Sequence, residues 1–392
     1  MKERLTVEAC LPEDREAVLV GRVFVPALDG PVLVRVTHDS TVDLSPVAPT
    51  CSDLMEHADP ADTVRRARVL NAIGPTTDLL RNSIASERDD ARPWFLAPCD
   101  LQAIKAAGVT FVASMLERVI EEQARGDPMK AEGVRVAIVG VIGDDLRSVR
   151  PGSSEAARLK QVLIEQKVWS QYLEVGIGPD AEIFTKSQPM SAVGTGADIG
   201  IHPRSTWNNP EPEVVLVVNS RAETVGATLG NDVNLRDFEG RSALLLGKAK
   251  DNNASCAIGP FVRLFDGRFG VDDIRHAHLR MHVEGPDGFR LDGDSAIAEI
   301  SRDPLDLVAQ AIGPNHQYPD GLVLFLGTMF APTQDRHTTG QGFTHEVGDI
   351  VTVRTQTLGA LVNRVEHCDR IEPWTFGVRA LMRSLARRGL LT

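Results

Sequence analysis

The stretch that decides the fold is "WNNPEPEVVLVVNS", Trp207 to Ser220, in which two glutamates precede an almost unbroken apolar run. The run from Val214 to Val218 is rich in β-branched residues and has no polar interruption, which predicts a buried strand. Side chains alternate faces along a strand, so Glu211 and Glu213 point the same way. At about 5 Å and an effective dielectric of about 20, their charges repel by roughly 3 kcal/mol. The pair therefore needs a positive charge nearby or a solvent-exposed strand end.

A third carboxylate, Asp232, follows in "LGNDVNLRD". The residues between Glu213 and Asp232 have the pattern of a turn and a second strand, which would bring Asp232 beside the glutamates. Three carboxylates from two strands form a hard-oxygen site that suits Mg²⁺ or Mn²⁺. The alternative is a solvated glutamate pair, with Asp232 in a turn after Gly230.

Composition and charge limit the function. The chain has 392 residues, 42% of them hydrophobic, and a net charge of −12 from 42 Lys plus Arg against 54 Asp plus Glu. This balance argues against a nucleic-acid or anionic-membrane surface. The N-terminal segment lacks a signal-peptide pattern, and no apolar run reaches the about 18 residues of a membrane span. We expect a cytoplasmic protein that binds a small molecule.

Secondary-structure signals divide the chain unevenly. A β-rich beginning spans residues 16–37, and short apolar strands alternate with turns from Ile183 almost to the end. Residues 112–175 between them carry helical periodicity. The pattern predicts an α+β fold that is mostly β, with a small N-terminal domain over 1–100 and a catalytic domain over 101–392 that includes the helical lid region 112–175.

Five segments of the second half resemble, in order, the motifs of the fumarylacetoacetate hydrolase superfamily. They are "FTKSQPMSAVGTG" (184–196), "EPEVVLVVN" (211–219), "GNDVNLRD" (230–237), "KAKDNNASCAIGP" (248–260) and "LFLGTMF" (324–330). The resemblance implies a mixed β-roll fold, a dimer or higher homo-oligomer, and a divalent ion that chelates a 2-keto acid. It implies Mg²⁺, with Mn²⁺ as a substitute.

The resemblance also implies site residues. They are the metal ligands Glu211, Glu213 and Asp232, the active-site lysine Lys250, and the substrate-binding residues Gly327, Thr328 and Arg236. A lysine beside such acids is either held cationic or becomes a base when it is desolvated, and both states are open.

One motif departs from the hydrolytic members of the family. Those members carry Asn-Tyr-x-x-His-x-x-Glu near the start of a lid helix, where the His–Glu pair activates water. The equivalent stretch here is "TFVASMLE", which keeps Glu117 but has Ser114 at the histidine position. Ser114 is a candidate catalytic position, yet a serine hydroxyl cannot act as a general base near pH 7. The chain is therefore poorly equipped to hydrolyse a C–C bond.

The long form of the chain, with "LAPCDLQAIKAAGVTF" before that helix, is similar to the 2-keto-3-deoxy-D-arabinonate dehydratase branch. This similarity implies a hydro-lyase that converts a 2-keto-3-deoxy pentonate to 2,5-dioxopentanoate, the semialdehyde of 2-oxoglutarate, in non-phosphorylative pentose catabolism. Two alternatives remain. One is a hydrolase of acylpyruvates or 2,4-diketo acids, and the other is a non-catalytic member that binds keto acids.

Two further residues are candidates within this interpretation. Glu182 precedes Glu211 by a separation similar to that of the branch's extra glutamate, which makes it a candidate acid–base group; the alternative is a surface glutamate. Arg22 is a candidate for binding the substrate carboxylate, because a guanidinium binds carboxylate in bidentate fashion. The alternative for Arg22 is a salt bridge on a strand.

Overall fold

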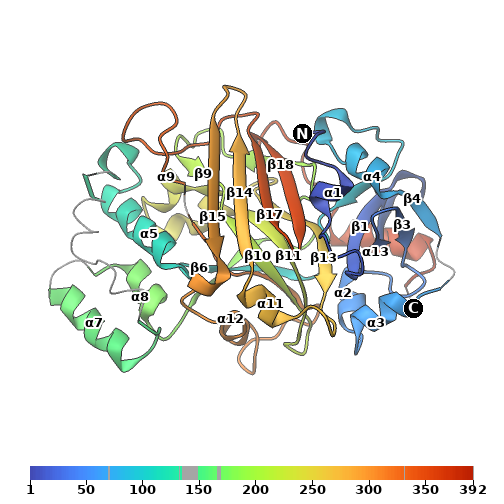
Figure 1. Ribbon diagram of the computed structural model, residues 1–392, viewed down its shortest axis with the longest axis horizontal. Coiled ribbons are helices and arrows are strands. Elements are labelled where there is room, and N and C mark those ends of the chain that lie inside the picture. Colours follow the sequence, from blue (N-terminus) through green and yellow to red (C-terminus); the bar gives the residue numbers. More distant parts are fainter. Residues whose placement is uncertain (69–70, 132, 135–148, 166–168, 331, 392) are drawn as a thin grey trace.

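The computed structural model describes residues 1–68, 71–131, 133–134, 149–165, 169–330 and 332–391 (Figure 1). In the described part of the chain, the strands form one sheet of eleven strands, one of five and a two-stranded pair. The large sheet has the order β4-β3-β2-β1-β13-β11-β10-β16-β6-β7, and β5 pairs with β1. Its strands are β1 (Leu19–Val25), β2 (Gly30–Val36), β3 (Ser40–Asp43), β4 (Ala72–Pro75), β5 (Trp94–Leu96), β6 (Ala103–Gly108), β7 (Glu182–Ser187), β10 (Pro212–Val218), β11 (Thr224–Asp232), β13 (Cys256–Leu264) and β16 (Leu322–Phe325).

The smaller sheet packs against the large one. Its order is β15-β14-β17-β18-β8, and Figure 1 shows its strands in front of β10 and β11. Apolar residues of β14 and β17 share a buried cluster with Val214 and Leu216 of β10. The strands outside the large sheet are β8 (Asp198–Ile201), β9 (Asn208–Asn209), β12 (Asn234–Leu235), β14 (His278–Glu284), β15 (Arg290–Ala296), β17 (Ile350–Thr355) and β18 (Gly359–His367).

Strand β10 lies at the centre of this packing. It pairs with β11 on one side and β16 on the other, and all seven of its residues are buried. Val214, Leu216 and Val218 face the core between the sheets, whereas Val215 and Val217 belong to a second buried cluster on the opposite face. Both faces are covered, so the run from Val214 to Val218 is apolar without alternation.

Side-chain caps mark the starts of several helices. Asp59 caps α3 and Asp303 caps α12, and each is followed by a proline, which is pre-set for the first helical turn. The helices are α1 (Val7–Cys10), α2 (Cys51–Met55), α3 (Pro60–Arg66), α4 (Thr76–Asn82), α5 (Val112–Ala124), α7 (Ser154–Glu165), α8 (Gln171–Ile177), α9 (Arg236–Glu239), α10 (Leu246–Lys250), α11 (Val271–Arg275), α12 (Pro304–Ala311) and α13 (Val378–Arg387). Among the described residues, no helix has both the length and the apolar character needed to cross a membrane.

The predicted lid region corresponds to α5, α7 and α8. Figure 1 shows these helices at the end of the molecule opposite α1 to α4 and α13. Met115 and Val119 of α5 share a buried cluster with Leu173 and Ile177 of α8. Residues 135–148 and 166–168 of this region lie outside the described residues.

The N-terminal strands continue the large sheet. β1 pairs with β13, and Val20 and Leu33 belong to the same buried cluster as Val215 and Val217. Residues 1–100 therefore share a core with the rest of the chain, and the expected domain boundary near residue 100 stays a prediction.

Candidate metal and active site

Glu211, Glu213 and Asp232 come together at one end of the β10–β11 hairpin. Glu211 directly precedes β10, Glu213 is its second residue, and Asp232 ends β11, where its N–H donates to the carbonyl of Glu211 at 2.9 Å. Carboxylate oxygens of the three residues lie within 4.8 Å of one another, and each residue is at most 2% exposed. The proximity expected from the alternation of strand side chains and from the hairpin is confirmed.

Two lysine ammonium groups offset part of this negative charge. Lys250, at the end of α10, contacts Glu211 Oε2 and lies 3.1 Å from Asp232 Oδ2. Lys186 on β7 is fully buried and lies 2.8 Å from Asp232 Oδ1. Burial raises the pKa of Asp232, but the two ammonium groups outweigh it and hold that pKa below its usual range. Burial lowers the pKa of Lys250, but the charges of Asp232 and Glu211 outweigh burial. The pKa of Lys250 is therefore raised.

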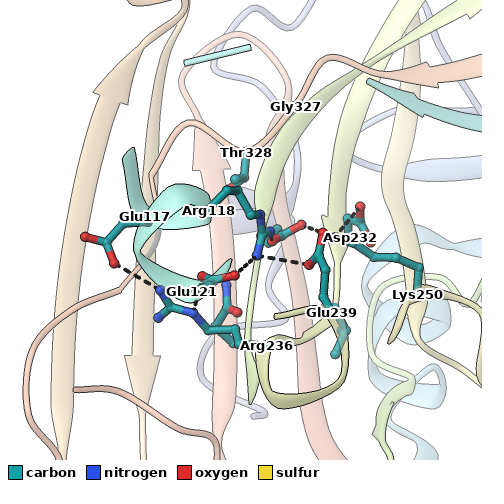
Figure 2. Close-up of polar contacts among 12 residues, drawn as sticks. Glu117, Arg118, Glu121, Asp232, Arg236, Glu239, Lys250, Gly327 and Thr328 are labelled. Carbon is teal, nitrogen blue, oxygen red and sulfur yellow. Dashed lines mark hydrogen bonds and ion pairs between the residues drawn. The ribbon is translucent and has the colours of Figure 1, made fainter. Parts of the chain in front are cut away.

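Arg118 of α5 supplies a third cation. Its guanidinium contacts Glu211 Oε1, donates to Glu121 Oε2 at 2.6 Å, and lies 3.0 Å from Glu239 Oε2 (Figure 2). Burial opposes its charge, but these glutamates raise the pKa of Arg118 well above its usual value. Both oxygens of Glu211 therefore contact a cation, Arg118 on one side and Lys250 on the other.

Glu213 differs from its two neighbours. Within the described residues it has no ion pair, and its carboxylate accepts one hydrogen bond, from the Gly327 N–H at 2.7 Å. Burial, followed by the charges of Asp232 and Glu211, raises the pKa of Glu213 well above its usual range. A fully buried carboxylate beside two others, without a cation of its own, fits a bound divalent ion, because such an ion prefers oxygen ligands and supplies the missing positive charge.

Gly327 and Thr328 lie beside the carboxylates. Gly327 has φ +99°, and a Cβ there would lie 2.0 Å from Thr110 Oγ1, so the backbone N–H reaches Glu213 only if this residue is glycine. Thr328 lines the cavity beside the carboxylates, and its hydroxyl donates to the Phe330 carbonyl at 2.9 Å.

The cavity at the triad holds two more carboxyl groups. Its volume of about 20 Å³ has room for a water molecule or an ion. Glu182 begins β7 directly opposite Gly108 of β6, and its carboxyl group lies against that glycine, where a Cβ would collide with it. Burial, followed by the charge of Glu239, raises the pKa of Glu182 to about 7. Glu239 ends α9, is 4% exposed, and has a pKa raised by burial against the opposing charge of Arg118.

Arg236 lies beside the cavity but not in its lining. Its guanidinium donates to Glu121 Oε1 at 2.6 Å, to Glu117 Oε2 at 3.1 Å and to the Pro332 carbonyl at 3.2 Å (Figure 2), and it stacks 4.5 Å from the ring of Trp207. These contacts occupy the group that was expected to bind substrate. These contacts connect α9 to α5, and the expected role of Arg236 in substrate binding stays a prediction.

Arg22 is not among the described residues that line the cavity at the triad, and its expected contact with the substrate carboxylate stays a prediction. It is 5% exposed and donates to the carbonyls of Ala97 and Cys99, with Asp100 at 3.8 Å. The reason is the pairing of β5 with β1, which brings the carbonyl groups that follow β5 to the guanidinium. The last predicted residue, Ser114, lies in α5, but its side chain is outside the described residues.

Sequence reasoning missed Arg118, Lys186 and Glu239. The sequence did contain a signal for Arg118. Met115, Arg118, Glu121 and Ala124 follow one another at intervals of three residues, so Arg118 and Glu121 lie on the apolar face of the helix. Charged residues on such a face need buried partners.

Comparison with known proteins identifies the family of the chain. A model of the fumarylacetoacetate hydrolase C-terminal domain matches residues 160–366, more than half of the chain. The chain belongs to this family. The resemblance and the α+β fold expected from the sequence are thereby confirmed.

Two relatives within the family are named as dehydratases. The chain is 31% identical over 201 residues to a probable 2-keto-3-deoxyxylonate dehydratase of Haloferax volcanii, covering 51% of this chain and 65% of that protein. It is 30% identical over 190 residues to the 2-dehydro-3-deoxy-D-arabinonate dehydratase of Saccharolobus solfataricus, covering 47% and 58%. The match thus spans less than two thirds of each relative.

Solved structures of the family share the fold over most of the chain. The structure of 2-keto-3-deoxy-D-arabinonate dehydratase complexed with magnesium and 2,5-dioxopentanoate superposes with a TM-score of 0.60 at 19% identity, covering 90% of this chain and 100% of that one. A hexagonal crystal form of 2-keto-3-deoxyarabinonate dehydratase has a TM-score of 0.61 at 18% identity, with the same coverage.

Proposed function

We propose that this protein is a divalent-metal-dependent hydro-lyase that removes water from a 2-keto-3-deoxy pentonate to give 2,5-dioxopentanoate. The observation that carries the proposal is the buried cluster of Glu211, Glu213 and Asp232, in one cavity with a carboxyl group, Glu182, whose pKa is about 7. The names of the two relatives support the choice of substrate class.

Under this proposal the triad holds Mg²⁺, with Mn²⁺ as a substitute. A bound divalent ion would orient the oxygens of a 2-keto acid and favour the negative charge that develops on the keto oxygen when C3 loses a proton. Arg118 and Lys250 contact the two oxygens of Glu211 and so fix the direction in which that carboxylate faces. Gly327 does the same for Glu213 through its N–H.

Loss of water requires a proton to leave C3 and another to reach the C4 hydroxyl. The C3–H electron pair forms the C3=C4 double bond, and the C4 oxygen leaves as water. A proton shift from C5 to C3 then gives an enol that becomes the C5 aldehyde. Glu182 is suited to donate to the leaving hydroxyl, because a carboxyl group with a pKa of about 7 is still partly protonated at neutral pH.

A product assay separates this function from its alternatives. Purified protein with Mg²⁺ is incubated with 2-keto-3-deoxy-D-arabinonate and, separately, with an acylpyruvate, and the products are identified by NMR. We expect 2,5-dioxopentanoate from the first and no pyruvate from the second. Pyruvate release would identify a hydrolase instead. If neither product forms and the keto acid still raises the Tm, the protein is a keto-acid-binding member.

Assembly and location belong to the same proposal. We expect a cytoplasmic homodimer or higher homo-oligomer, which light scattering coupled to size exclusion tests directly. A monomeric mass at micromolar concentration would refute the expected assembly.

A further inference from the structure

The dehydration proposed above needs a second proton-transfer group besides Glu182, and this inference rests on that proposed function. The group must lie in the cavity and must accept a proton from C3. Three of the cavity carboxylates form the metal triad, and the Thr328 hydroxyl donates to the Phe330 carbonyl. The Lys250 ammonium donates to two carboxylates, and a guanidinium such as that of Arg118 does not give up its proton in a protein.

Among the described residues that line the cavity, one carboxyl group remains. We propose that Glu239 is the base that removes the C3 proton, that Arg118 positions it, and that Glu182 is its acid partner. Sequence analysis did not single out Glu239, and the comparisons assign it no role.

The contacts of Arg118 support the placement of Glu239. One terminal nitrogen of Arg118 lies 3.0 Å from Glu239 Oε2, and the other contacts Glu211 (Figure 2). A single rigid guanidinium therefore holds the proposed base and a proposed metal ligand in a fixed relation. Glu121 holds Arg118 in turn, through a 2.6 Å hydrogen bond on the same helix.

The two carboxyl groups lie in different surroundings. Burial of Glu239, which is 4% exposed, raises its pKa, and the paired cation Arg118 opposes that rise and favours the ionised form that a base requires. Glu182 is half-buried and lies against Gly108, and within the described residues it has no ion pair. It therefore lacks a paired cation like the one that Glu239 has. Two carboxyl groups in such different environments can divide the roles of acid and base.

The proposed step balances in protons and electrons. Glu239 takes the C3 proton, the C3–H pair forms the C3=C4 bond, and the C4–O bond breaks as Glu182 donates its proton, so that water leaves. Glu239 is then protonated and Glu182 ionised. In the following shift Glu182 accepts a proton from C5 and Glu239 returns its proton to C3, which restores both groups.

The test uses a keto acid that cannot lose water. 2-Oxobutanoate has C3 protons but no C4 hydroxyl, so their exchange in D₂O, followed by ¹H NMR with Mg²⁺ and with an EDTA blank, reports the base alone. Glu239→Gln is expected to lower the enzyme-dependent exchange rate by about 100-fold or more. Glu182→Gln is expected to keep exchange within about threefold while lowering dehydration of the pentonate by about 100-fold. The matched control is Glu223→Gln, in the turn at the other end of the β10–β11 hairpin, which should leave both rates unchanged.

Mg²⁺ titration calorimetry and thermal unfolding separate a base from a structural residue. The base role predicts that Glu239→Gln keeps its Mg²⁺ affinity within about threefold. If this variant does not fold, Glu239→Asp is used in its place. Aspartate keeps the negative charge facing Arg118, but its shorter side chain holds the carboxylate farther from the substrate, so exchange should still fall while the Tm stays unchanged.

The outcomes distinguish this inference from the proposed function. Exchange at the wild-type rate in Glu239→Gln, loss of exchange in Glu182→Gln instead, or loss of Mg²⁺ binding together with exchange would overturn the assignment. No exchange by the wild-type protein would also overturn it. Exchange by the wild type without water loss from the pentonate would refute only the proposed substrate, and the role of Glu239 would stand on the exchange data.

Discussion

Replacing Glu182 with glutamine is expected to change how the stability of the metal-free protein depends on pH. Burial and the nearby charge of Glu239 raise the pKa of Glu182 from its ordinary value of 4.5 to about 7. Between these two values the folded protein keeps a proton that the unfolded chain releases, so the free energy of unfolding falls as the pH rises. At about 1.4 kcal/mol per pKa unit, this rise of about 2.5 units has a full cost of about 3.5 kcal/mol. Because the side chain is half-buried and partly screened, we expect about 2 kcal/mol.

Glutamine has no proton to lose and therefore removes this cost. The free energy of unfolding of the wild type and of Glu182→Gln is measured in urea, with EDTA present, at pH 5 and at pH 8. Between these pH values, the difference between the two proteins should change by about 2 kcal/mol in favour of the variant. Glu223→Gln, at an exposed turn, is the control and should show no such shift. A difference between Glu182→Gln and wild type that stays constant over this range would refute the raised pKa, and a shift of opposite sign would show that ionised Glu182 is stabilised.

Three further substitutions test the site. Glu213→Gln should weaken Mg²⁺ binding in calorimetry by about tenfold or more, because it removes the carboxylate without a cation of its own, and unchanged affinity would exclude Glu213 as a ligand. Gly327→Ala should lower the free energy of unfolding by about 1–3 kcal/mol, because alanine is strained at φ +99° and its Cβ would meet Thr110; wild-type stability in urea would contradict this. Lys250→Ala should lower kcat more than it raises the Kd for a 2-keto acid, whereas equal losses would make Lys250 a binding group only.

The proximity of the three carboxylates could be predicted from the sequence because it depends on local regularities. Residues two apart on a strand point to the same face, and a hairpin brings the start of its first strand close to the end of its second. The proximity of Glu211, Glu213 and Asp232 therefore follows from alternation and spacing. The apolar run behind them predicts a strand buried on both faces, which β10 is. The positions of Lys250 and of the Gly327 loop followed from family motifs rather than from spacing.

The partners of these carboxylates depended on contacts between elements distant in sequence. Arg118 of α5 contacts Glu211 and Glu239, and no periodicity within α5 specifies which carboxylate a guanidinium on its buried face will contact. Arg22 and Arg236 carry the same guanidinium group as Arg118, yet Arg22 donates to backbone carbonyls and Arg236 to Glu121 and Glu117. The identity of a residue determines that a buried charge needs a partner, whereas the packing of helices on the sheet decides which one it has.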